Sequence, residues 1–378
     1  MATMWKRIMW SVSLLAIFGV GYILFSLYHE ETVYTIRQVD ANGALLKPQT
    51  FRSGHVLTDV NYKKKVNGYK LISTDKKFPK RFGFTNQVIT LTYKVKHPKK
   101  SLKQLTSANY LAAGYEILTS NTVNGFQEDK SDDHINNLRL MTSNDGTTWK
   151  TLYANYPNVF VRDPTPIRIH KKLVVLYTDG ILTTSNLTKW TNKGFQFNND
   201  KLKLQIVNSP DVFYGKNRKL NIVFSGVSLN HKNSKLYVTS FSKKKLNVGK
   251  KLHRVSGTKM SASLSDPHID YHDGYYYLSA LNSDTQELCY YRSAQPYSGY
   301  RRLRDVKLPT VKMLGPNVLR VGNHYQLVFN MINSTDSTVS VPYVIKFKNY
   351  GNMRLKTKGM QGFKVPSQVN SIGFEPQK

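Results

Sequence analysis

The 378-residue chain has little cysteine, few acidic residues, and no long apolar run beyond its first 28 residues. With a single cysteine, Cys289, no disulfide can form within the chain, which excludes a disulfide-stapled extracellular fold. Cys289 stands in the strand-like run LCYYR, where we expect a core residue. No segment beyond residue 30 keeps a 3.6-residue hydrophobic period, which excludes a helical bundle.

The one long apolar run lies near the N-terminus. Residues 8–28 carry no charge, and a helix of this length spans about 30 Å, the thickness of a bilayer core. Lys6 and Arg7 precede the run and Glu30 and Glu31 follow it. The positive-inside rule therefore predicts a cytoplasmic segment 1–7, an uncleaved signal-anchor helix, and the rest of the chain outside a Gram-positive-type cell membrane.

The charge predicts the kind of partner. There are 55 lysines and arginines against 23 acidic residues, a net charge of +32, and the excess is densest within 33–100. Such a surface suits polyanions. Outside the membrane, an anionic cell-wall polymer fits better than nucleic acid, which we do not expect as a partner. No cofactor is expected, because neither a phosphate-binding loop nor a Cys/His metal pattern is present.

After the anchor, period-2 alternation dominates the sequence. In VITLTYKV the side chains of Ile89, Leu91 and Tyr93 alternate with polar ones, and Gly, Asn and Asp separate such runs about every ten residues. This pattern predicts an all-β protein. The polar, basic stretch 98–107 is predicted to be a linker between two domains.

The segment 33–97 carries three short motifs in order. They are VDANG from Val39, GYKL from Gly68 and QVITLTYK from Gln87. We expect a turn at Asp40–Gly43, where Gly43 can take a positive φ. Together the motifs resemble the MucBP (mucin-binding-protein) domain of lactic-acid bacterial surface proteins, which implies a small β-grasp-like module that binds or only spaces.

The segment 108–350 contains a repeat. Four copies align on a proline, and each reads as an inner strand, a tight turn and a second strand: RDPTPIRIHKKLVVLYT, NSPDVFYGKNRKLNIVFSG, SDPHIDYHDGYYYLSA and LGPNVLRVGNHYQLVFN. A fifth copy without the proline is expected to begin at Ala108. Five such units predict a five-bladed β-propeller, with residues 351–378 as a C-terminal tail. A β-sandwich is the alternative, but it gives no reason for the repeat.

The residues before the prolines should meet at one end of the propeller axis. Asp163 and Asp266 would then approach each other, with Asp211 nearby, and paired carboxylates are what glycosidic cleavage needs. Near the same place we expect substrate contacts from Arg162, Asn208, His268, Asn317 and His324. The alternative is that Asp-Pro serves only as a strand-entry turn.

At these motifs the chain resembles the propellers of glycoside hydrolase families 43, 32 and 68. The family 43 pattern implies Asp163 as general base and Asp266 as the residue that tunes its pKa, but Leu314 stands where the acid glutamate belongs. The family 32 pattern matches Arg162 to Pro164 instead and puts Asn208 at the acid position. In both registers the acid is lost, and Asp211, Glu116 and Glu287 are possible replacements.

Two functions follow from these motifs and from the charge. The first is a membrane-anchored propeller that binds glycan or anionic wall polymer without cleaving it. The alternative is an active glycoside hydrolase with a displaced acid, acting on arabinan, xylan or fructan. The Asp-box-like turn Asn144 to Trp149 is expected to be a fold element only.

Overall fold

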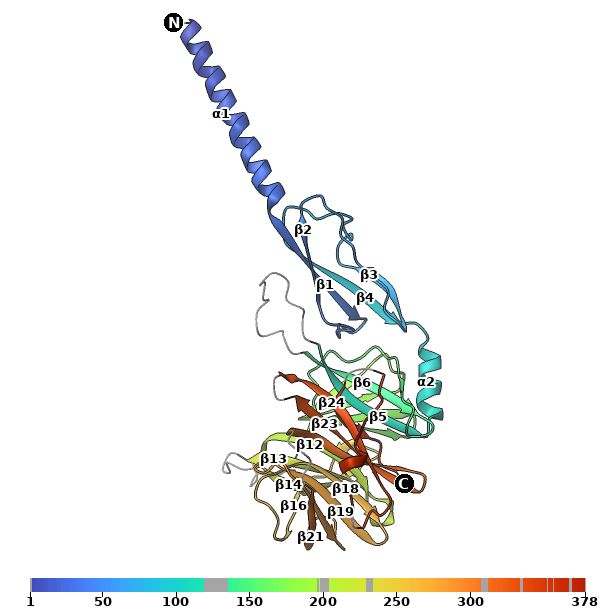
Figure 1. Cartoon of the computed structure of the whole chain (residues 1–378). Helices are drawn as coiled ribbons and strands as arrows, with labels where there is room; N and C mark the ends of the chain where they lie inside the picture. The colour runs from blue at the N-terminus through green and yellow to red at the C-terminus, as the bar shows by residue number, and fades with distance from the viewer. Residues whose placement is uncertain are drawn as a thin grey trace. The chain divides into compact units, whose positions relative to one another are not determined.

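A computed structural model describes residues 2–118, 135–195, 197, 204–228, 234–306, 312–333, 336–351, 353–355, 357–366 and 369–377. The chain divides into two compact units, the first holding Met1–Lys96 and the second most of the chain from His97 on. Each unit is described by itself (Figure 1).

The first unit begins with a single long helix, α1, over Ala2–His29. Its described apolar side chains are exposed, among them Trp10, Leu15 and Phe18. Within the described residues, no helix reaches the length and hydropathy that a membrane span requires. The expected span 8–28 also includes Ile8, Leu24 and Leu27, whose side chains lie outside the described part.

A four-stranded mixed sheet follows in the first unit. Its strands are β1 (Glu31–Asp40), β2 (Thr50–His55), β3 (Tyr69–Thr74) and β4 (Gln87–Val95), in the order β2-β1-β4-β3 with β1 and β4 parallel. The turn after β1 forms as predicted, because the Asp40 carboxylate accepts the Asn42 and Ala44 amides and Gly43 has a φ of 85°. The relation to MucBP domains stays a prediction.

The second unit consists of mainly antiparallel sheets after the short helix α2 (Pro98–Ser107). The first is β26-β5-β6-β7, from Asn370–Phe374, Tyr110–Leu118, Ile135–Ser143 and Lys150–Thr151. The second is β8-β9-β10-β11, from Thr165–Ile169, Lys172–Tyr177, Gly180–Thr184 and Thr191–Gly194. The third is β12-β13-β14-β15 with β16, from Leu204–Tyr214, Leu220–Ser228, Lys235–Ser242, Asn247–Val248 and His253–Arg254.

Two further sheets complete the described part of this unit. One is β18-β19-β20-β21-β17, from Leu264–His272, Tyr275–Asn282, Leu288–Ser293, Tyr300–Val306 and Gly257–Thr258. The other is β22-β23-β24-β25, from Lys312–Val321, His324–Asn333, Asp336–Phe347 and Gln361–Gly362. The predicted hairpins β8–β9, β12–β13, β18–β19 and β22–β23 are all present.

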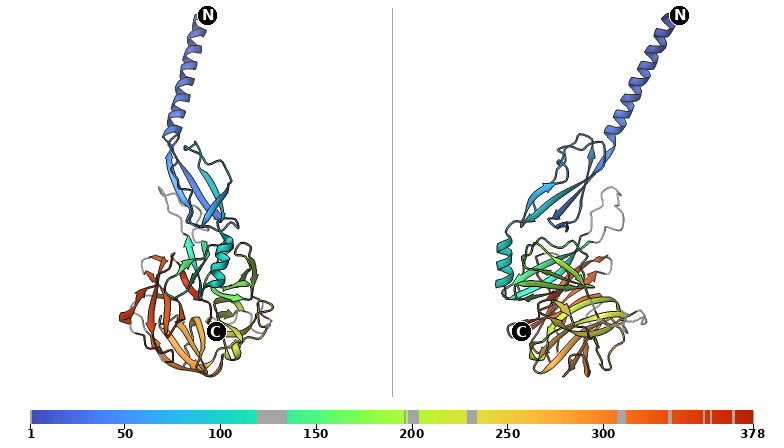
Figure 2. Two further views of the ribbon diagram at one scale, coloured as in Figure 1. Left: turned by 90° about the vertical axis from the view of Figure 1, so that its right-hand side faces the viewer. Right: turned by 180° about the vertical axis from the view of Figure 1, so that it is seen from behind.

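The sheets form a closed ring. Their first strands contact one another in the order β8, β12, β18, β22 and β26, and β26 contacts β8 again. Apolar clusters fill the space between neighbouring sheets; one joins Ala112 and Met141 of β5 and β6 to Leu319 and Val328 of β22 and β23. Figure 1 draws the green β5 beside the red-orange β23 and β24, and Figure 2 shows the sheets from two further sides. A closed ring of sheets around an axis is a β-propeller.

Two segments differ from the sequence-based boundaries. The sequence predicts a tail over residues 351–378, but Asn370–Phe374 forms β26, which pairs with β5 and supplies the inner strand of the first sheet. The expected copy from Ala108 therefore supplies the second strand of its sheet and not the first. The expected linker 98–107 is the helix α2, whose Leu105 is buried and whose Gln104 amide donates to Thr142 Oγ1 and Thr151 O.

The Asp-box-like turn is a fold element, as predicted. The Asp145 carboxylate accepts the amides of Thr147 and Thr148 at 2.7 Å each, and Trp149 is buried beneath. These amide hydrogen bonds lower the pKa of Asp145.

Candidate functional site

One residue in or just before the inner strand of every sheet in the ring has an unusual backbone conformation. Its φ lies between 45° and 54°, in the left-handed region that L-residues rarely adopt. The pairing of β12, β18, β22 and β26 with its neighbour shifts register at this place. The left-handed residues are Asp163, Ser209, Asp266, Gly315 and Ser371.

These residues surround one hollow of about 290 Å³. The hollow, which we call the funnel, brings together three of the predicted catalytic residues, Asp163, Asp211 and Asp266, and the predicted substrate contact Asn317. The other residues that line it are Pro164, Thr165, Ser209, Pro210, Pro267, Gly315, Pro316, Ser371, Ile372 and Gly373. The funnel therefore lies on the axis, where the inner strands meet.

Ser209 joins the two carboxyl groups of the funnel. Its Oγ lies 3.0 Å from Asp163 Oδ2 and 2.5 Å from Asp266 Oδ1. The two carboxyl oxygens can be no further apart than the sum of these distances. Thr178 Oγ1 donates to the same Asp163 oxygen at 3.2 Å. The space between the two carboxyl groups is thus occupied by a hydroxyl of the protein itself.

This arrangement needs a proton. A hydroxyl donates one hydrogen bond, so Ser209 cannot donate to both carboxylates, and one carboxyl group must donate to it. Burial and the neighbouring Asp163 carboxylate raise the pKa of Asp266 to about 6. Asp266 is therefore the carboxyl group that holds the proton below about pH 6, and Ser209 then donates to Asp163.

A second layer of polar side chains lies one step further along the inner strands. Asp211 is buried; its Oδ2 lies 2.8 Å from His268 Nδ1, and its Oδ1 accepts from Thr165 Oγ1 at 3.4 Å. Gly373 takes the corresponding place on β26, where a Cβ atom would lie 2.3 Å from Pro164 O. Asp211 is thus engaged within the protein by His268 and Thr165.

Two further residues interact electrostatically with the Asp163 and Asp266 pair. Burial and the Asp163 carboxylate raise the pKa of Tyr115, on β5, while the Arg162 guanidinium acts in the opposite direction. Arg162 is exposed directly before Asp163 and also lowers the pKa of Asp266, although less than burial raises it. Arg162 does not line the funnel, and its contact with substrate stays a prediction.

The remaining predicted contacts do not line the funnel. Asn208 precedes Ser209 in β12, and its carbonyl accepts from Ser225 Oγ at 3.2 Å. His324 is the first residue of β23, directly after the turn from β22. His268 lines a different cavity further along the axis. Leu314 precedes Gly315 in β22, so an apolar side chain stands at the register position of the acid.

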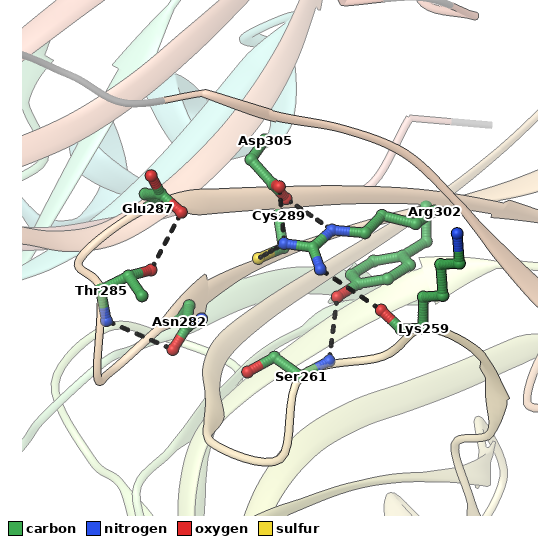
Figure 3. A network of polar contacts seen from close by, with 9 residues as sticks. Lys259, Ser261, Asn282, Thr285, Glu287, Cys289, Arg302 and Asp305 are labelled. Carbon is green, nitrogen blue, oxygen red and sulfur yellow. Dashed lines mark hydrogen bonds and ion pairs between the residues drawn. The ribbon is translucent and has the colours of Figure 1, made fainter.

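The two glutamates considered as replacement acids are also placed elsewhere. Glu116 forms an ion pair with Arg139, with Nε and Oε2 2.6 Å apart. Glu287 accepts from Thr285 Oγ1 in the turn before β20, beside the network of Arg302, Asp305 and Cys289 (Figure 3). Neither glutamate lines the funnel.

Cys289 is a core residue, as predicted, and burial raises the pKa of its thiol to about 11. The described residues contain no group of three or more His, Cys, Asp or Glu side chains arranged to hold a metal ion.

Sequence reasoning missed Ser209, Thr178 and Tyr115. Ser209 was visible as the residue before Pro210, at the same repeat position as the two aspartates, and that alignment was a sufficient signal. Tyr115 lies in the second strand of its sheet and Thr178 directly follows the second strand of another, where no motif marks them. Ser371 lies in a copy that lacks the proline.

No known protein family and no curated protein matches the sequence. Among solved structures, the chain is similar to a family 43 glycoside hydrolase of Xanthomonas citri in complex with xylose, with 12% identity, 68% of this chain and 96% of that one covered, and a TM-score of 0.49. An α-L-arabinofuranosidase of Clostridium thermocellum has 13% identity, coverage of 65% and 92%, and a TM-score of 0.44. An arabinanase of Bacillus subtilis has 14% identity, the same coverage and a TM-score of 0.43. These similarities are too distant to assign a reaction to this chain.

Proposed function

We propose that this chain is a cell-surface protein that binds a glycan or an anionic wall polymer in the funnel without cleaving it. The observation that carries the proposal is the Ser209 hydroxyl between Asp163 and Asp266. Cleavage with retention or inversion needs the sugar, or a water, between an acid and a second carboxyl group. The space between Asp163 and Asp266 is filled, so these two are not spaced as such a pair, and Leu314 stands where the family 43 pattern has its acid. What remains is a set of carboxyl and hydroxyl oxygens suited to sugar hydroxyls.

An active hydrolase is the second candidate, and one observation favours it. With a pKa raised to about 6, Asp266 is protonated in weakly acidic solution and can donate a proton. Asp266 would then be the displaced acid and Asp163 the base. Turnover by this route should fall as the pH rises above 6, because the acid loses its proton.

One experiment separates the two candidates. The full chain is tested for binding and turnover on arabinan, xylan, fructan and galactan oligosaccharides, together with Asp163→Asn and Asp266→Asn. In a binder, Asp163→Asn keeps one acceptor oxygen and weakens binding by about 1–3 kcal/mol, with no turnover anywhere. In a hydrolase, turnover falls about 100-fold or more in both variants. Asp284→Asn, in an exposed turn, is the charge-matched control and should change neither quantity.

Each outcome has a clear meaning. Turnover that Asp163→Asn or Asp266→Asn abolishes rules out the binder. Binding without turnover, weakened in Asp163→Asn, rules out the hydrolase. If no glycan binds and none is cleaved, both proposals fail, and a propeller that binds protein is left.

We also propose that α1 anchors the chain in the membrane, with the propeller outside the cell. The proposal is supported by the uncharged segment 8–28, the continuous helix Ala2–His29, and the basic pair Lys6 and Arg7 before it. The four-stranded unit that follows is proposed to act as a spacer or wall-binding module of the MucBP kind. Protease added to intact cells should degrade everything beyond about Glu31, whereas a protected C-terminal epitope would mean the opposite orientation.

A further inference from the structure

A second cavity lies on the propeller axis, beyond the funnel. It is lined by the later residues of four inner strands, β12, β18, β22 and β26, and its empty space, with its opening to solvent included, is about 620 Å³. We call it the axial cavity. Asn317 lines both the funnel and the axial cavity, so the two hollows occupy successive levels of one axis. Its polar lining residues include His268, Asp270, His272, Asn317, Arg320 and Glu375.

Two buried side chains of the axial cavity have a polar atom with no hydrogen-bond partner in the described part of the chain. They are His268 Nε2 and Asn317 Oδ1, and each residue is only 8% exposed. Buried polar atoms in folded proteins are nearly always paired with protein, water or ligand. Both residues line this cavity, so whatever enters it meets a free donor and a free acceptor.

The chemistry of the lining selects the kind of ligand. The Nδ1 atom of His268 is held by Asp211, which leaves Nε2 to face the cavity. Burial alone lowers the pKa of His268, but the Asp211 carboxylate, with help from Asp270, raises it above the ordinary value. Nε2 of His268 donates when the ring is charged and accepts when it is neutral, and a hydroxyl group can pair with it in either state, while Asn317 Oδ1 accepts.

The charges of the lining are mixed, which disfavours a charged ligand. Burial raises the pKa of Asp270 and so favours its neutral form, and the Asp211 carboxylate already occupies the Nδ1 side of His268. Glu375 is already paired with Arg168, and Arg320 is exposed at the edge. Two tyrosines, Tyr271 and Tyr325, add aromatic surface. Hydroxyl groups, which donate and accept, match these partners, and aromatic rings pack well against the C–H groups beside them.

We propose that the axial cavity is a binding site for one neutral polyhydroxylated unit, a monosaccharide or a sugar alcohol, separate from the funnel. Nε2 of His268 pairs with one ligand hydroxyl, and Asn317 and Asp270 accept from others. This site does not depend on whether the funnel binds or cleaves glycan, because His268 and Asp270 do not line the funnel and Asn317 is the one residue that the two hollows share.

The test measures equilibrium binding to the purified full chain by calorimetry. The protein is kept in a detergent without a sugar headgroup, because such a headgroup would compete. The probes are glucose, xylose, arabinose, sorbitol and xylitol, with glucuronate and glucosamine as charged counterparts of glucose. We expect at least one neutral probe to bind, and glucuronate and glucosamine to bind at least ten-fold more weakly than glucose.

Variants locate the binding. Asn317→Leu removes an acceptor and should raise Kd at least ten-fold, and so should Asp270→Leu, at a residue that lines the axial cavity but not the funnel. Asn317→Asp keeps an acceptor oxygen and should retain more of the affinity. His324→Gln and Asp284→Asn, which line neither cavity, should leave Kd within two-fold. An unchanged Kd in Asp270→Leu, with a lowered affinity in Asp163→Asn, would assign the sugar to the funnel and overturn the proposal.

A second measurement holds even where Asn317→Leu does not fold. Crystals of the wild-type chain grown with the tightest neutral probe should show it within hydrogen-bond distance of His268 Nε2. Ordered water alone at that place, or no binding by any neutral probe, would refute the site. If the sugars bind more tightly than the sugar alcohols, the natural ligand is a sugar unit; the reverse order of affinities indicates a sugar alcohol.

Discussion

At the scale of single residues, the funnel is built on unfavourable backbone conformations. Four of its five left-handed residues, Asp163, Ser209, Asp266 and Ser371, are not glycine. A non-glycine residue in this region costs roughly 1–3 kcal/mol, and glycine avoids most of that cost. Polar side chains therefore stand at these positions despite the strain, as is common where a ligand is bound.

The first prediction concerns the bridging hydroxyl. Ser209→Ala leaves Asp163 and Asp266 facing each other without the group that joins them. We expect a loss of about 1–3 kcal/mol in the free energy of unfolding, because buried polar groups lose their partner. Chemical denaturation measures this loss. Ser185→Ala, in an exposed turn, is the matched control and should change stability by less than about 0.5 kcal/mol. Equal effects in the two variants would mean that the bridge contributes nothing.

The second prediction concerns pH. In the unfolded chain Asp266 has its ordinary pKa of 3.8, and in the folded chain its pKa is about 6. The folded chain therefore holds the extra proton between these values. The stability that Asp266 contributes is fully present below about pH 4 and is lost as the pH rises through 6.

Asp266→Asn removes this dependence because its side chain stays neutral. Compared with the wild type, the variant should gain on the order of 2 kcal/mol of stability between pH 4 and pH 7. Unfolding free energies at the two pH values measure the change. If the unfolding free energies of the wild type and the variant differ by the same amount at both pH values, Asp266 is already ionised in the folded chain.

At this scale, most of the acidic residues of the funnel could be predicted from the sequence. Asp163 and Asp266 could be placed together because they precede prolines in equivalent repeats, and Asp211 because it follows one. The sequence did not predict that Asp163 lies in one layer of the axis and that Asp211 and His268 lie in another, two residues further along the inner strands. This separation depends on the left-handed residue in each inner strand, which neither the hydrophobic period nor a sequence motif reveals.

At the scale of elements, β26 is the part that sequence reasoning could not supply. Its copy of the repeat, NSIG, lacks the proline on which the others align. Its partner β5 lies at the other end of the propeller sequence, so no local pattern links them. Helix α2 was missed for a different reason, since only Ser101 and Leu105 of its ten residues are buried, too few to form a hydrophobic period.

The third prediction tests how tightly β26 is fitted. In Gly373→Ala the new Cβ would lie 2.3 Å from Pro164 O and 2.8 Å from Thr165 Oγ1, so β26 or β8 must move. We expect a loss of about 1–3 kcal/mol, as for other overpacked cores. Gly362→Ala, in β25, meets nothing within 4 Å and is the matched control. Thermal unfolding compares the two, and an unaffected Gly373→Ala would mean that β26 is loosely held.

At the scale of the whole molecule, charge is the dominant property. With 55 basic residues and 23 acidic ones, most basic side chains cannot find an acidic partner within the chain. Long-range attraction of a polyanion follows from this excess whatever the funnel binds.

The fourth prediction is therefore a salt dependence. Binding of the full chain to an anionic wall polymer should weaken strongly between 0.1 M and 1 M salt, where the Debye length falls from about 10 Å to about 3 Å. Binding of a neutral glycan to the funnel should change far less. Co-sedimentation with the two polymers measures both, and anionic-polymer binding that is equal at the two salt concentrations would make the charge incidental.

The pairing of β26 with β5 also sets the order of events during biosynthesis. A ribosome makes β5 before the other four sheets of the ring, and its inner neighbour β26 only after them. The ring therefore cannot close before β26 has been made, and a contact between such distant segments forms slowly. Until then the apolar side chains that β26 covers on the first sheet are open to other partners, so this is the stage of synthesis at which the propeller is most exposed to misfolding.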